Sequence, residues 1–169
     1  MAGRAGHRDV RSQRLLPVAA AVAGAAAIGV GVHQGLVHVA PGYEGTIVTG
    51  WGRTLNHEER LLAWLGALGV AGAVGSLRWR RLAVLPAATG GVVLCYALRA
   101  VATYALDPGL YVEVSASGGP TRFVLGAEPF LLVAGGALLV VAAVRGWRAT
   151  ADGTTDGDAP PTPSSRDRT

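Results

Sequence analysis

Residues 82–106 read LAVLPAATGGVVLCYALRAVATYAL, and Arg99 is the only charged residue among them. A helix needs roughly 20 apolar residues to cross a hydrocarbon core of about 30 Å. The apolar residues here form a continuous run, not the interrupted pattern of an amphipathic helix or a half-buried strand. The run stops at Asp107-Pro108-Gly109, a strong helix breaker. The stretch therefore predicts a membrane-spanning helix.

Three other apolar stretches predict further spans, at residues 15–39, 57–77 and 128–147. The span at 57–77 follows Asn56, a suitable N-cap, and Glu59 three residues later completes a capping-box pattern. Together the four stretches predict an all-α integral membrane protein. Its core is a four-transmembrane-helix bundle that occupies residues 15–148.

The two tails differ from this apolar part. Residues 1–14 carry four arginines and predict a basic tail, whereas residues 149–169 are rich in Asp, Thr, Pro, Ser and Gly and predict a disordered tail. A basic tail before an apolar run is also typical of a signal peptide, and the alanines at 25–27 offer a cleavage-like site. The apolar run continues well beyond these alanines, which favours retention of the segment as a membrane anchor.

The arginines near the predicted spans are distributed unevenly between the two sides of the membrane. Nine belong to the N-terminal tail, the turn between the second and third spans and the exit of the fourth span, and three belong to the opposite loops. Because cytoplasmic segments carry an excess of basic residues, both termini are predicted to be cytoplasmic. The nine are Arg4, Arg8, Arg11, Arg14, Arg78, Arg80, Arg81, Arg145 and Arg148; the three are Arg53, Arg60 and Arg122.

Composition narrows the class of partner. All 15 basic residues are arginines, a bias typical of a prokaryotic genome rich in G and C. The formal net charge of +4 raises nucleic acid as a partner, but the arginines flank apolar spans instead of gathering in one stripe. The lipid bilayer is therefore the predicted partner and nucleic acid is not, with a second copy or another membrane protein as further candidates. Cys95 is the only cysteine, so neither an internal disulfide nor a cysteine-based metal motif is expected.

The loops opposite the cytoplasm show weak strand patterns. In the second of these loops, residues 110–114 and 120–124 alternate around a Gly/Ser turn and predict a β-hairpin. The first loop contains one short β-like run at residues 46–48. The fold class therefore includes a small outer β-hairpin cap over the helices.

Small residues recur at every fourth position in three spans, which places them on one face of each helix. Helices in lipid associate through close approach of small residues, so these ladders predict the packing faces. Chance occurrence in a chain rich in Ala and Gly is the alternative. The ladders are Ala19, Ala23, Ala27, Gly31 and Gly35; Ala63, Ala67, Ala71 and Gly75; and Ala83, Ala87, Gly91 and Cys95.

Polar residues near the outer ends of the spans form the predicted ligand-binding set, which is His33, Gln34, His38, Arg99 and Glu128. Arg99 continues the small-residue face of its span, so it is predicted to face protein and to pair with Glu128; snorkelling of Arg99 to the interface is the alternative. Glu128 also suits a helix N-terminus. His33 and His38 lie about 140° apart around a helix and cannot hold one metal ion together, so hydrogen-bonding or interfacial roles are favoured for both.

The sequence contains no nucleophile–base pair, phosphate-binding glycine loop or zinc motif, and no cofactor or metal is predicted. It favours a small, non-enzymatic, multi-pass protein of the prokaryotic cell membrane that acts as a structural or accessory component. The alternative is a transporter or redox-partner subunit whose outer-side polar pocket binds a small ligand, a proton or a quinone.

Overall fold

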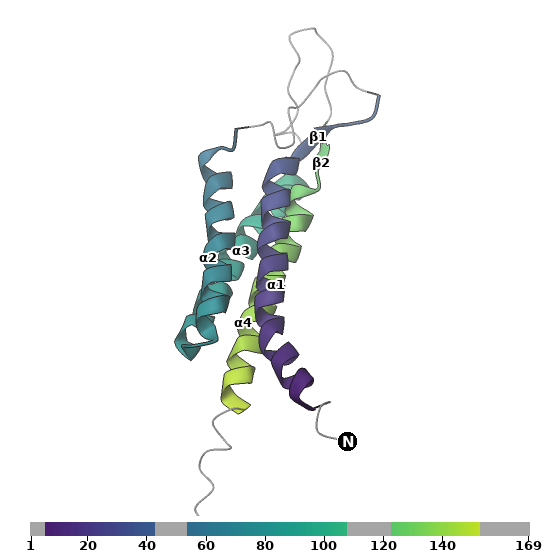
Figure 1. Ribbon diagram of the computed structural model, residues 1–169. Helices are drawn as coiled ribbons and strands as arrows, with labels where there is room; N and C mark the ends of the chain where they lie inside the picture. The colour runs from purple at the N-terminus through teal and green to yellow at the C-terminus, as the bar shows by residue number, and fades with distance from the viewer. Residues whose placement is uncertain (1–5, 43–53, 108–122, 153–169) are drawn as a thin grey trace, which may run out of the picture.

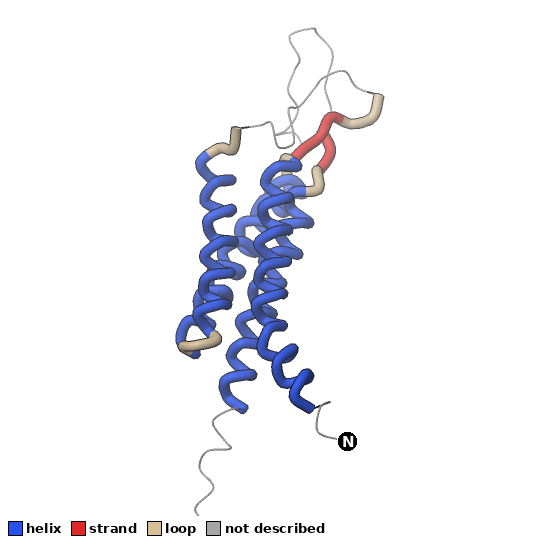
Figure 2. The backbone as a smooth tube through the Cα atoms, viewed as in Figure 1, coloured by secondary structure: helices blue, strands red, loops and turns tan. Residues whose placement is uncertain are grey.

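The computed structural model describes residues 6–42, 54–107 and 123–152, which form mainly helices. In chain order the elements are α1 (Gly6–Gln34), β1 (Val37–Val39), α2 (His57–Ser76), the 3-10 helix η1 (Arg80–Ala83), α3 (Val84–Leu106), β2 (Phe123–Leu125) and α4 (Glu128–Asp152). The four α-helices run alternately up and down (Figure 1). Figure 2 shows both strands at one end of the helices. We call this the strand end, and the opposite end, which carries η1, the turn end.

Neighbouring helices pack around a common centre, where α2 also contacts α4. α1 contacts α2 and α4, and α3 contacts the same two helices. Between them lie fully or almost fully buried apolar side chains, among them Ile28, Val93, Leu132 and Leu139. All four helices therefore contribute to one core cluster.

Three of the described helical segments are long and apolar enough to cross a membrane: Leu15–Gln34, Arg80–Leu106 and Glu128–Arg148. α2 is of similar length but is not among them, because Glu58, Glu59 and Arg60 in its first turn make it more polar. The structure is therefore compatible with a multi-pass membrane protein. That α2 also spans the membrane stays a prediction.

Two helix ends lie where capping and breaking residues predict them. α2 begins at His57 with a complete capping box: the amide of Glu59 donates to Oδ1 of Asn56 at 2.8 Å, and the amide of Asn56 donates to Oε2 of Glu59 at 2.8 Å. α3 ends at Leu106, immediately before Asp107. These short-range signals act within one turn of helix, so they can be recognised without knowing the neighbouring helices.

The first helix ends earlier than the apolar run predicts. The run continues to Val39, but α1 stops at Gln34 because Gly35 adopts a left-handed conformation with φ of 81°. Such a residue is a common helix terminator, and glycine adopts it without a steric penalty. The residues beyond it form β1, so His38 lies in a strand and not in a helix.

In the small sheet, the partner of β2 is a segment that was not predicted as a strand. β1 pairs with β2 in an antiparallel register that places Val37 opposite Leu125 and Val39 opposite Phe123. The amide of Gly126 also donates to the carbonyl of Leu36 at 2.7 Å. The strand predicted at 120–124 overlaps β2, whereas those at 110–114 and 46–48 lie outside the described residues. The pairing follows from the packing of α1 on α4, which no local sequence pattern reveals.

The small-residue ladders mark the packing faces only in part: Gly31, Gly35 and Ala83 are buried, whereas other members are exposed. In α1, Ala19 and Ala23 are exposed, and in α2 the same holds for Ala67 and Ala71. In α3, Cys95 is exposed. The buried faces also contain glycines at other spacings, because glycine permits a closer approach of two backbones than alanine does.

A second ladder in α2 explains how this helix contacts several neighbours. Gly66, Gly69, Gly72 and Gly75 recur every third residue, and each step of three turns the face by about 60° around the helix. A Cβ on Gly66 would lie 3.5 Å from Ala25 in α1, whereas one on Gly69 would meet Thr89 of α3 and Leu139 of α4 at 2.9 and 2.8 Å. A Cβ on Gly72 would lie 2.5 Å from that of Leu85. The glycines therefore turn progressively from α1 toward α4 and α3.

Candidate functional site

A polar cavity of about 280 Å³ opens at the strand end between α2 and α3. Its walls combine two charged side chains of opposite sign with two hydroxyl-bearing side chains. The lining residues are Leu36, Glu58, Tyr96, Arg99, Ala100 and Thr103. Leu36 lies just after α1, so the cavity is built from three separate parts of the chain.

The contribution of α2 is oriented by its N-terminus. Glu59 is buried and belongs to the capping box, while the neighbouring Glu58 is exposed and lines the cavity. The phenol oxygen of Tyr96 donates a hydrogen bond to Oε2 of Glu58 at 3.0 Å. An anionic side chain is also favoured here because the first turn of a helix carries a partial positive charge. Capping box, helix dipole and tyrosine together hold the Glu58 carboxylate at the cavity wall.

The contribution of α3 comes from one side of its last turns. Tyr96, Ala100 and Thr103 are spaced at i, i+4 and i+7, and Arg99 is three residues after Tyr96, so all four project on neighbouring positions of one helix face. Arg99 is exposed, whereas Tyr96, Ala100 and Thr103 are half-buried. The cavity therefore offers a permanently charged guanidinium at its open side and hydroxyl groups deeper in the wall.

This arrangement suits recognition of a small polar molecule. A guanidinium donates up to five N–H groups and binds carboxylates or phosphates, while an ionised carboxylate only accepts hydrogen bonds. The cavity thus has one place for an anionic group and one for a cationic or hydrogen-donating group. The hydroxyl of Thr103 can donate a hydrogen bond to the anionic group or accept one from the cationic group.

Arg99 is the one member of the predicted ligand-binding set that lines this cavity. The ladder that Arg99 continues changes along α3 from the buried Ala83 to the exposed Cys95, and Arg99 itself is exposed. The pairing of Arg99 with Glu128 stays a prediction. The two groups differ in exposure, since Arg99 is exposed and Glu128 is 4% exposed.

The other four predicted residues lie around the ends of α1 and α4. Nδ1 of His33 donates to the backbone oxygen of Gly29 at 2.8 Å, a bond within α1. Gln34 is the last residue of α1, and Glu128 is the buried first residue of α4. His38 in β1 packs on Gly126, where an added Cβ would lie 2.9 Å from the imidazole ring.

The predicted set is therefore divided between two places at the strand end. Arg99 belongs to the cavity between α2 and α3, and the histidines and Glu128 belong to the region where the sheet joins α1 to α4. Within the described residues, no group of three or more His, Cys, Asp or Glu side chains is placed to hold a metal ion.

The sequence contains signals for the cavity residues that the predicted set does not use. Tyr96, Ala100 and Thr103 share a helix face with or beside Arg99, a spacing visible in the sequence. Glu58 and Glu59 are adjacent, and a capping box uses only the carboxylate of Glu59. The carboxylate of Glu58 is therefore available for another contact. Only the packing of α2 on α3 shows that these two groups meet.

No protein-family model, curated protein or solved structure matches this chain. The basis for a function is therefore the chemistry of the cavity and the arrangement of the helices.

Proposed function

We propose that the protein is a non-enzymatic accessory component of the prokaryotic cytoplasmic membrane that binds a small zwitterion at its outer surface. In this proposal all four helices span the bilayer as a bundle, both termini are cytoplasmic, and the strand end faces outward. The observation that carries the proposal is the presence of Glu58 and Arg99 in one cavity with Tyr96 and Thr103.

The size and charge of the cavity favour a molecule such as a free amino acid. A volume of about 280 Å³ lies near the lower end of the roughly 300–1,000 Å³ typical of small-molecule pockets. A carboxylate ligand group suits Arg99, and an ammonium group suits Glu58, so a molecule with both satisfies both walls. A singly charged molecule leaves one wall unsatisfied and binds less tightly.

The packing beyond the cavity supports binding over conduction through one chain. Toward the turn end, α2 lies so close to α3 that a Cβ on Gly72 would be 2.5 Å from Cβ of Leu85. Gly69 is similarly close to Thr89 and Leu139. The helices are therefore closely packed on the turn-end side of the cavity.

The distribution of arginines supports the proposed orientation. The start of α1, the η1 turn and the end of α4 lie together at the turn end (Figure 1). These segments carry most of the arginines of the spans and their flanks, and cytoplasmic ends of membrane proteins are enriched in basic residues. The turn end is therefore the cytoplasmic end in this proposal.

The test is a binding titration on the full chain purified in detergent. Each of the standard amino acids is titrated by calorimetry, with acetate and ethylamine as singly charged probes. We expect saturable binding of at least one amino acid and much weaker binding of the two probes. Replacement of Arg99 or Glu58 by Gln is expected to weaken that binding about tenfold or more, because each removes a hydrogen bond to a charged group.

Arg60→Gln is the control for the loss of a charge. Arg60 lies in the same turn of α2 as Glu58, is exposed and does not line the cavity; its Nε donates to the backbone oxygen of Leu55 at 3.0 Å. Binding in this variant should match the unmodified protein. Absence of binding for every amino acid, or equal loss in Arg60→Gln and Arg99→Gln, would show the proposed ligand class or site to be wrong.

A further inference from the structure

A second cavity lies at the turn end, far along the helices from the polar one. It is a groove of about 270 Å³ between the start of α3 and the end of α4. Six of its seven lining residues are apolar. They are Ala83, Val84, Ala87, Ala143, Val144 and Trp147, and the seventh is Arg148.

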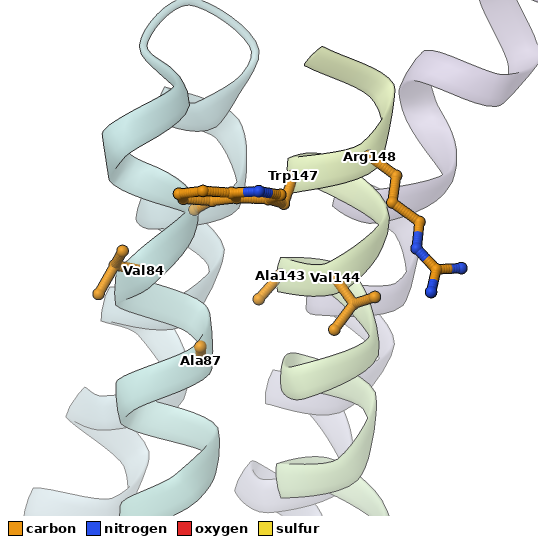
Figure 3. Close-up of a pocket in the computed structure, with 7 residues that line it drawn as sticks. Val84, Ala87, Ala143, Val144, Trp147 and Arg148 are labelled. Carbon is orange, nitrogen blue, oxygen red and sulfur yellow. The ribbon is translucent and has the colours of Figure 1, made fainter. Parts of the chain in front are cut away.

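The shape of the groove is set by side-chain size. Ala87 and Ala143 carry only a methyl group and leave a space between the two helices, and Val84 and Val144 stand beside it (Figure 3). The indole of Trp147 extends from α4 toward α3 across the end of this space (Figure 3). Val84, Val144 and Trp147 are 55%, 44% and 47% exposed, so the groove opens on the outside of the protein.

The end of the groove beside Trp147 is basic. The guanidinium of Arg80 lies 4.5 Å from the centre of the Trp147 ring, a cation–π contact. Arg148 lines the groove from the side of α4 away from Val84 (Figure 3). Neither residues 77–87 nor residues 140–148 contain an acidic residue. An apolar channel and a cationic rim thus adjoin each other.

We infer that this groove binds a phospholipid with an anionic headgroup from the cytoplasmic leaflet. One acyl chain lies along Ala87 and Ala143, and the headgroup phosphate lies at Arg148 and Arg80. The inference rests on the membrane insertion and orientation given under the proposed function. It does not depend on the zwitterion site at the strand end.

Two observations select a lipid as the occupant. The groove lies on two segments, Arg80–Leu106 and Glu128–Arg148, that are apolar enough to cross a membrane, so its opening faces acyl chains in a bilayer. Its charged rim lies where the segment Arg80–Leu106 begins and the segment Glu128–Arg148 ends. In a bilayer this is the depth of the lipid headgroups. Basic pockets between helices on the cytoplasmic side match anionic headgroups, and tryptophan prefers the same interface.

Native mass spectrometry on the delipidated full chain tests this inference with defined lipids. Phosphatidylglycerol and phosphatidylcholine with identical acyl chains are added in separate titrations. We expect one phosphatidylglycerol to bind preferentially. Arg148→Gln should weaken this binding about fivefold, the effect of one arginine near a lipid surface, whereas Arg145→Gln should change it less. Arg145 is also exposed on α4 but does not line the groove.

A second pair of variants tests the apolar part of the groove. Ala87→Leu places a larger side chain in the groove and should abolish the preferential binding. Ala88→Leu adds the same side chain at the next, exposed position of α3 and should leave it intact. The two substitutions have the same apolar character, so a general effect of hydrophobicity on the detergent complex acts on both.

Several outcomes would overturn the lipid site. They are equal binding of the two lipids, equal effects within either pair of variants, and a dimer that persists without lipid and is broken by Ala87→Leu. Amino-acid binding measured on the same samples separates the two sites. If it persists while lipid preference is absent, the groove inference alone fails; if the protein is compact and soluble without detergent, membrane insertion fails and both proposals with it.

Discussion

Two adjacent glutamates illustrate how single residues divide structural and functional roles. Glu59 is buried and closes the capping box with Asn56, and Glu58 lines the polar cavity and accepts the hydrogen bond of Tyr96. The cap fixes the backbone of the first turn of α2, and this turn determines where Glu58 points. Loss of the cap therefore affects both stability and the cavity.

Asn56→Ala should lower the stability of the protein by about 1 kcal/mol, because the amide of Glu59 loses its acceptor at the N-cap. Reversible unfolding in mixed micelles with increasing sodium dodecyl sulfate measures this change. Asn56→Asp is the control, since aspartate is an equally good N-cap and should retain nearly all of the stability. Equal destabilisation by both substitutions would be inconsistent with a stabilising cap.

At the scale of helices, close contacts at glycine decide which faces meet. A Cβ on Gly24 of α1 would lie 2.8 Å from the backbone oxygen of Gly135 in α4. By contrast, a Cβ on Gly29, also in α1, would have no neighbour within 4 Å. Within the same helix, therefore, Gly24 is closely packed and Gly29 faces open space.

Opposite effects are therefore expected from the same substitution at these two positions. Gly24→Ala should destabilise the protein by about 1–3 kcal/mol, because α1 and α4 must separate to admit the methyl group. Gly29→Ala should leave stability unchanged or raise it by up to about 1 kcal/mol, since alanine favours the helix. The unfolding assay described for Asn56 distinguishes them. A similar loss of stability in both variants would argue against close contact at Gly24.

Helix ends were predictable from the sequence where a capping or breaking residue acts locally, as at Asn56 and Asp107. Helix faces were predictable only in part, because the buried face depends on the neighbouring helix. The alanine ladder in α2 looks as suitable for packing as the glycine ladder that does pack. The end of α1 was also missed, since Gly35 terminates the helix only through its positive φ angle, and other glycines in α1 continue it.

The polar cavity can be predicted only when the arrangement of the whole molecule is known. Its charged groups come from α2 and α3, and Leu36 comes from the segment after α1. The sequence shows Arg99 as an unusual residue in an apolar run, and this single feature led to part of the site. The pairing of Arg99 with Glu128 stays a prediction, because it depends on which helix ends adjoin.

On the same scale, the four-span proposal predicts that the two ends of α2 lie on opposite sides of the membrane. Cys95 is the only cysteine of the chain, so Cys95→Ala provides a background for single introduced cysteines. In intact cells, an impermeant maleimide should label Thr54→Cys. It should label Arg78→Cys only after the membrane is permeabilised, because residue 78 belongs to the proposed cytoplasmic turn.

Two results would contradict this topology. Labelling of both cysteines in intact cells would place α2 on the outside without crossing, and the reverse order of labelling would invert the orientation. Cys95→Ala without an introduced cysteine is the control for background labelling.

The pairing of β1 with β2 has a consequence for biosynthesis. The two strands are far apart in the sequence: β1 follows the first helix, and β2 precedes the last helix. A chain still emerging from the ribosome holds β1 long before its partner has been made. The edge of β1 therefore stays unpaired until residues 123–125 have been made, and a chaperone or protease that recognises such an edge would distinguish molecules before and after this point.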